Sequence, residues 1–173
     1  MTRWVFIGAA LLALAGCASV APPAGEAPPL AGRLAVTVAA HEGASARSGS
    51  TQFELHGSAE RGRLVLTSPL GTTLARASWQ PGSAQADTGG GVQRHASLDA
   101  LAERLLGEKL PLAALVEWLH GRPWSAAPHA PVPGGFEQLG WGIDTSRRAD
   151  GLLLATRAAA PAITVRALLD TPQ

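Results

Sequence analysis

The chain has 173 residues and an almost balanced charge, with 14 Lys and Arg against 13 Asp and Glu, and it contains a single cysteine. The lack of a polybasic run argues against nucleic acid as a partner, and one cysteine excludes a fold held together by intramolecular disulfides. The length is typical of one domain, whose stability must come from an apolar core.

The first 16 residues have the pattern of a secretory signal peptide, in which a charged start and an apolar run precede small residues. Arg3 supplies the charge and residues 5–14 the run, which is too short for the roughly 20 residues of a membrane-spanning helix. The Leu-Ala-Gly-Cys stretch that ends at Cys17 resembles the bacterial lipobox. This resemblance implies cleavage before a lipidated Cys17, and Ala18 after it implies sorting to the outer membrane.

Residues 17–31 are rich in Pro and Ala, which predicts an extended tether between the lipidated cysteine and one folded domain at residues 32–173. The domain begins with segments in which apolar and polar residues alternate, a pattern typical of half-buried antiparallel strands. Strands are predicted over residues 32–38, 50–57, 62–69 and 72–80, with two weaker ones around the glycines at 89–91.

The hydrophobic period then changes to that of a helix. Ser97 is a good N-cap and Gly107 a helix stop, and a second helix is predicted from Pro111 to Gly121. Residues 122–135 are rich in proline and predict a loop. Strands resume over 136–145, 151–157 and 162–169. This order predicts an α+β fold in which helices pack on one face of an antiparallel sheet.

Patterns for catalysis and metal binding are missing from the sequence. None of the five histidines has a neighbour at metal-ligand spacing, so all are expected on loops or solvated faces. Ser68 lies outside any G-x-S-x-G stretch, and the glycines at 89–91 lack the lysine of a phosphate-binding loop. We therefore expect no enzyme activity, no metal and no cofactor. An anchored hydrolase would need a nucleophile and base that the sequence does not offer.

Three later stretches, in the order in which they occur, resemble the LolB family of outer-membrane lipoprotein receptors. They are LTSPLGTTLARASWQPG at 66–82, LGEKLPLAALVEWLHGRPW at 106–124 and FEQLGWGID at 136–144. Together with the lipobox, the resemblance covers most of residues 14–169. The chain lacks aromatic residues that the family often carries near Leu55, near Thr145 and at the C-terminus.

The resemblance implies an incomplete antiparallel β-barrel, or curved sheet, that encloses an apolar cavity capped by short helices. The cavity would take lipoprotein acyl chains from a soluble, LolA-like periplasmic carrier. The chain, a monomer anchored to the outer membrane and facing the periplasm, would release them into the inner leaflet. Candidate cavity residues are Leu34, Val36, Phe53, Leu64, Leu66, Leu101, Leu105, Leu112, Leu115 and Trp118.

The stretch Pro69-Leu70-Gly71 predicts a tight turn, because Pro69 cannot donate to a sheet ladder and Gly71 tolerates positive φ. In the family this loop presents an apolar residue that helps place cargo in the membrane, and Leu70 is the matching position.

Two alternatives stay open from the residues alone. The apolar candidates could simply fill an ordinary core. The chain could also be another lipid-binding or structural envelope lipoprotein that performs no handover.

Overall fold

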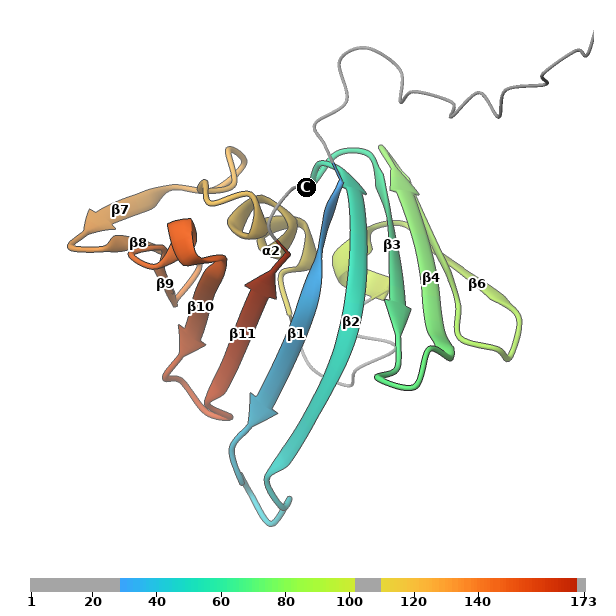
Figure 1. Ribbon diagram of the computed structural model, residues 1–173, viewed down its shortest axis with the longest axis horizontal. Helices are drawn as coiled ribbons and strands as arrows, with labels where there is room; N and C mark the ends of the chain where they lie inside the picture. Colours follow the sequence, from blue (N-terminus) through green and yellow to red (C-terminus); the bar gives the residue numbers. More distant parts are fainter. Residues whose placement is uncertain (1–28, 102–109, 171–173) are drawn as a thin grey trace, which may run out of the picture.

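The computed structural model describes residues 29–101 and 110–170. Within these ranges, eleven strands form a single antiparallel sheet in the order β6-β5-β4-β3-β2-β1-β11-β10-β9-β8-β7. The sheet is curved and stays open, with β6 and β7 as its two edges (Figure 1). Cys17, the predicted signal peptide and most of the predicted tether lie outside the described residues, as does Leu105.

The strands expected from alternation are present, and the following bounds define the elements of the described chain. The strands are β1 (Leu30–Val38), β2 (Arg47–Gly57), β3 (Gly62–Thr67), β4 (Thr73–Gln80), β5 (Ser83–Asp87), β6 (Val92–His95), β7 (His129–Val132), β8 (Gly135–Gln138), β9 (Trp141–Asp144), β10 (Leu152–Arg157) and β11 (Ile163–Leu169). Helix α2 covers Leu112–Leu119, and η1, a 3-10 turn, covers Arg148–Asp150.

Two helices were expected, and both begin close to their predicted starts. Ser97 caps the first, since its Oγ accepts a hydrogen bond from the Ala100 N–H at 3.1 Å, and helical backbone follows over residues 98–101. Pro111, predicted in the first turn, is the N-cap residue of α2, so the helix begins one residue later than predicted. In the described part of the chain, no helix is both long and apolar enough to cross a membrane.

The predicted loop at 122–135 is wrong in part, because it contains strand β7. Pro131 lies within this strand and faces Phe136 of β8. A proline is tolerated there because β7 is an edge strand, so the missing N–H falls on the side without a neighbour. The proline-rich composition therefore concealed a strand that the hairpin with β8 stabilises.

The predicted strand segment at 136–145 is divided into β8 and β9 by a two-residue turn. Leu139 has φ 54° and Gly140 has φ 76°. Positive φ at both central residues is the geometry of a type I′ hairpin turn, where Asn-Gly is the usual pair. A leucine at the first position is unusual, because side chains with a Cβ pay a steric cost in the left-handed region.

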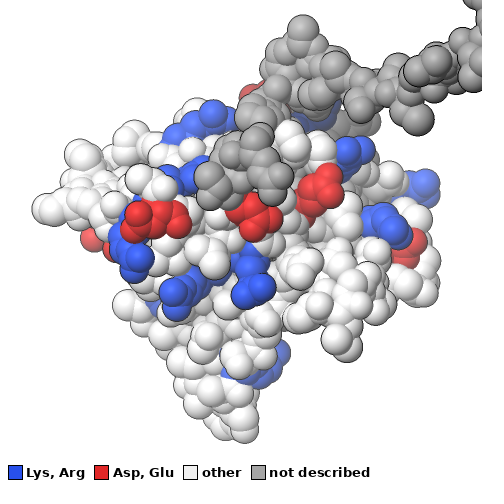
Figure 2. All heavy atoms as spheres, viewed as in Figure 1, with Lys and Arg blue, Asp and Glu red and all other residues white. Residues whose placement is uncertain are grey.

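The two faces of the sheet differ in polarity. Inward residues such as Phe53, Ile143 and Val165 are buried against α2 and belong to one continuous apolar core. The opposite face carries exposed charged residues, and Figure 2 shows acidic and basic side chains interspersed across it. The helices thus cover one face of the antiparallel sheet, which is the predicted α+β arrangement.

Candidate functional site

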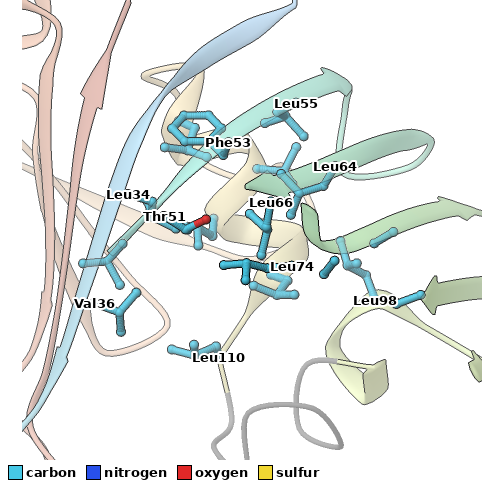
Figure 3. Close-up of a pocket in the computed structure, with 18 of the residues that line it drawn as sticks. Leu34, Val36, Thr51, Phe53, Leu55, Leu64, Leu66, Leu74, Leu98 and Leu110 are labelled. Carbon is cyan, nitrogen blue, oxygen red and sulfur yellow. The ribbon is translucent and has the colours of Figure 1, made fainter. Parts of the chain in front are cut away.

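An apolar pocket of about 360 Å³ lies between the inner face of β1–β5 and the helical segments (Figure 3). This volume is within the range of small-molecule binding pockets, about 300–1,000 Å³. Almost all of its surface is contributed by carbon atoms of leucine, valine, alanine and aromatic side chains. Such a lining offers hydrophobic contact and little opportunity for hydrogen bonding.

The pocket exists because small residues occupy several inward positions of neighbouring strands. Gly49 and Thr51 on β2 and Ala75 and Ala77 on β4 all line it, and Ala77 lies opposite Ala86 of β5 in the sheet register. Inward positions of β8 and β9 carry larger side chains, which fill the space against α2. The two halves of one inner face therefore differ: one is packed and the other is hollow.

Eight of the ten sequence candidates line this pocket. They are Leu34, Val36, Phe53, Leu64, Leu66, Leu101, Leu112 and Leu115. Leu105 lies outside the described residues. The contribution of these side chains to acyl-chain binding stays a prediction.

Trp118 is a correction to the predicted lining, since it does not contact the pocket. Its side chain is buried on another side of α2, with its ring centroid 5.8 Å from that of Trp141. Its indole N–H donates to Gln138 Oε1 at 2.8 Å. Helix α2 is apolar on more than one side, so the helical period alone could not separate the pocket wall from the packed core.

Gln138, which no sequence pattern singled out, ties α2 to the segment that follows it. Its Oε1 also accepts a hydrogen bond from the Trp124 N–H at 2.9 Å. Its Nε2 donates to the carbonyl oxygens of Trp124 and Ala127, both at 2.8 Å. With only 2% of its surface exposed, this amide satisfies four hydrogen bonds within the core.

Glu117 connects α2 to the β2–β3 hairpin. Its Oε1 accepts a hydrogen bond from the Ala59 N–H at 2.8 Å, and its Oε2 accepts one from Arg122 Nε at 2.6 Å. Burial alone would raise the pKa of Glu117, but these two hydrogen bonds and the charge of Arg122 hold it below the ordinary value. A glutamate flanked by Val116 and Trp118 was the available signal, because buried acids are normally paired.

His120 makes the next contact with the same hairpin and corrects the expectation of a solvated histidine. Its Nε2 lies 3.1 Å from the Gly57 carbonyl oxygen and donates to it. Burial lowers the pKa of His120, although the bond to Gly57 opposes this shift. The imidazole is therefore neutral at physiological pH, and α2 is held by one charged and one neutral contact.

The turn predicted at Pro69-Leu70-Gly71 is present. The Gly71 N–H donates to the Ser68 carbonyl oxygen at 2.9 Å, and Gly71 has φ 87°. The Leu70 side chain projects from this turn with 94% of its surface exposed. Its role at a membrane stays a prediction.

Leu74 is a pocket residue that the sequence analysis did not identify. The pairing of β3 with β4 shifts register between Leu66 and Thr67, which is a β-bulge. A bulge breaks the strict alternation of faces, and Leu74 and Ala75 both line the pocket as a result. The loose alternation in this stretch was the only signal of the bulge.

The pocket is closed at one end and more open at the other. Leu55 and Trp79, at one end of their strands, are 1% and 5% exposed. Leu74, at the other end and next to the Leu70 turn, is 45% exposed. Entry from solvent is therefore easiest on the side of the Leu70 turn.

The sequence matches the family model described as outer membrane lipoprotein LolB over residues 29–161. It is also similar to proteins named outer-membrane lipoprotein LolB in several bacteria. The Bordetella petrii protein is 36% identical over 169 residues, which cover 89% of this chain and 84% of the relative. The Bordetella pertussis protein is 38% identical over 150 residues, or 79% and 74% of the two chains. The Thiobacillus denitrificans protein is 33% identical over 159 residues, or 83% and 82%.

Proposed function

The chain belongs to the LolB family of outer-membrane lipoproteins, and from this premise we propose that its apolar pocket binds the acyl chains of other lipoproteins in transit. The protein receives lipoproteins from a LolA-like periplasmic carrier and inserts them into the outer membrane, on whose periplasmic side it is anchored. It acts by binding and release rather than by catalysis.

The observation that carries the acyl-chain proposal is a nearly all-carbon pocket that opens beside an exposed leucine. Each methylene group transferred out of water contributes about 0.8 kcal/mol, so about ten of them contribute roughly 8 kcal/mol. A bilayer offers the same transfer without confining the chain, which makes release into the membrane favourable. Handover in this direction then needs no ATP.

Three finer points complete the proposal. Cys17 would carry the lipid anchor, and residues 18–31 would tether the domain to it. A single chain supplies every described wall of the pocket, which supports activity as a monomer. Leu70 would enter the membrane surface, where burying one leucine contributes about 1.5–3 kcal/mol, enough to orient the domain but not to anchor it.

The test is a transfer experiment with the chain lacking residues 1–17 and a carrier loaded with a lipoprotein. Cargo should move from the carrier to the chain and then to added vesicles. Cargo that stays on the carrier would exclude the receptor function, and binding without onward delivery would indicate a lipid-binding protein that performs no handover.

Filling the pocket separates its role from that of the general core. Ala77→Phe adds a large side chain to an inward position that lines the cavity, so receipt of cargo should fall at least several-fold while cooperative unfolding is retained. Gln85→Phe, on the outward face of β5, is the matched control. Equal receipt by both variants would show that acyl chains bind elsewhere.

A further inference from the structure

The antiparallel order of the sheet divides its loops between two ends. Because every neighbouring pair is antiparallel, the loops after β1, β3, β5, β8 and β10 meet at one end. In Figure 1 the turns between β1 and β2, β3 and β4, and β10 and β11 lie at the lower end of the sheet. We call these loops the rim, and they consist of residues 39–46, 68–72, 88–91, 139–140 and 158–162.

The rim is built almost entirely from small and uncharged residues. Its sequences are AAHEGASA, SPLGT, TGGG, LG and AAAPA. Glu42 is the only Asp, Glu, Lys or Arg in these five loops, and its carboxylate lies 3.3 Å from His41. Figure 2 shows the lower end as mostly white, in contrast to the band of charge across the sheet above it.

The loops at the opposite end have a different composition. Two of the four carry charge, with Glu60 and Arg61 between β2 and β3, and Arg147, Arg148 and Asp150 between β9 and β10, whereas residues 81–82 and 133–134 are Pro-Gly turns. The molecule therefore has one charged end and one end with little charge in its loops. A general preference of loops for polar residues does not account for this difference, since both sets of loops are surface turns.

Exposed apolar side chains are concentrated at the rim. Six large apolar side chains are exposed in the described residues, and Leu70, Leu74, Val92 and Leu139 lie in the rim or within two residues of it. Only Val132 and Leu168 lie towards the other end. Single exposed leucines are normal on a protein surface, but four at one end form a distribution that needs an explanation.

Leu139 is the most informative of the four. It adopts φ 54° in a type I′ turn, where asparagine or glycine would fit with less strain, and 46% of its surface is exposed. Almost half of its surface is in contact with solvent, so it is not a core residue. Strain of this kind is retained where the residue has a role outside the folded core.

From these observations we propose that the whole rim, with Leu70 and Leu139 as its apolar tips, is a lipid-binding surface that seats the pocket mouth on the bilayer. This inference rests on the proposed acyl-chain function, because the pocket opens at the same end. It extends membrane contact from one turn to five loops drawn from both halves of the sheet.

The chemistry of the rim favours a lipid surface over a charged partner. A surface that binds through ion pairs needs charged side chains, and these loops contribute only Glu42. Insertion of small apolar loops between headgroups depends on hydrophobic transfer, which salt does not screen. Binding of the rim to the bilayer should therefore be insensitive to ionic strength and should not require anionic lipid.

The experiment uses the full chain, purified from membranes and reconstituted into phosphatidylethanolamine vesicles with or without phosphatidylglycerol. Cys17 is the only native cysteine, so Ala44→Cys, Ala159→Cys and Ala149→Cys each introduce one labelling site for an environment-sensitive dye. Positions 44 and 159 belong to the rim and 149 to the opposite end, and all three are exposed. Nitroxide-labelled lipid should quench the dye strongly at 44 and 159 and not at 149, in both lipid mixtures.

Leu139→Asn provides a second variant that is expected to fold at least as well as the original chain. It should cause a several-fold loss of quenching at position 159 and slow delivery of cargo to vesicles, while receipt from the carrier is unchanged. Quenching confined to a dye on Leu70→Cys would reduce the contact to one turn and overturn the proposal. So would quenching at 149, or dye responses that appear only when the carrier protein is added. Failure of cargo receipt would instead contradict the proposed function itself.

Discussion

Gln138 links α2 to the segment that follows it through four hydrogen bonds, which satisfy three backbone groups and the indole N–H of Trp118. Gln138→Ala should lower the free energy of unfolding by roughly 3 kcal/mol, because leaving a buried donor or acceptor unpaired costs about 1–3 kcal/mol. Urea unfolding measures this change. Gln85→Ala, which removes one exposed hydrogen bond to Ser78, is the control and should cost less than about 0.5 kcal/mol.

Leu139 leads to the opposite expectation for stability. Leu139→Asn should raise the free energy of unfolding by about 1 kcal/mol, because asparagine tolerates the left-handed region that leucine occupies at some cost. Thermal unfolding of the two chains under identical conditions measures the effect. A lower melting temperature for the variant would show that the Leu139 side chain contributes more through packing than it loses through strain.

These residues also show what could be read from the sequence. The Leu70 turn was predictable, because Pro and Gly restrict the backbone locally wherever they occur. The role of Gln138 could not be predicted, because its hydrogen-bond partners depend on how α2 packs on β8. Leu139 was missed for a related reason: leucine is a rare choice in a type I′ turn, and the Gly140 that follows it was the only local sign.

At the scale of elements, the contacts of α2 with the β2–β3 hairpin predict sensitivity to acid. Burial lowers the pKa of His120 in the folded protein, so below about pH 6.5 the unfolded chain binds more protons than the folded one. The free energy of unfolding therefore decreases as the pH is lowered. Glu117, whose pKa is also lowered, adds a second loss below the ordinary glutamate range. Both shifts act in the same direction.

Unfolding measured from neutral pH to about pH 5 tests the histidine contribution. His120→Gln keeps a donor for the Gly57 carbonyl but cannot take up a proton, so its stability should change less over this range. His129→Gln, on the exposed strand β7, is the control and should follow the original chain. An unchanged slope in His120→Gln would mean that other groups account for the acid sensitivity.

The elements themselves were predictable where one face of a strand is buried, since alternation then appears in the sequence. Strands β2, β10 and β11 follow this rule, whereas β6, at the other edge of the sheet, has no buried residue. β7 does not, because an edge strand has an unpaired side that accepts proline. The helical period predicted α2 but not the direction of Trp118, because α2 contacts both the pocket and the packed half of the core.

For the whole molecule, Leu70→Glu should separate the two steps of transfer. Receipt of cargo should be nearly unchanged, because Leu70 projects from the turn and does not line the pocket. Delivery to vesicles should fall, since a charge at the tip opposes entry into the lipid. Separate assays of receipt and delivery make the measurement, with Leu168→Glu on the outer sheet face as the control. Loss of receipt with normal delivery would assign the turn to carrier contact instead.

The family resemblance and the order of the strands predicted the overall architecture. Neither of them predicted which residues make the pocket hollow. Gly49, Ala75 and Ala77 line it from β2 and β4, two strands on the same inner face. Small residues give no periodic hydrophobic signal, so the hollow half of the inner face could not be distinguished from the filled half.

Strand β1 enters the sheet at the charged end, while the rim lies at its far end. In the proposed arrangement, with the rim on the bilayer and the lipid on Cys17, the anchor and the first residue of the domain would be separated by the height of the sheet. The nine residues of β1 span about 30 Å, and the twelve peptide bonds from Cys17 to Pro29 reach at most about 40 Å. A tether of this reach would just allow the domain to stand upright on the membrane that holds it. We therefore expect shortening of residues 18–29 to impair delivery of cargo more than a change of their composition does.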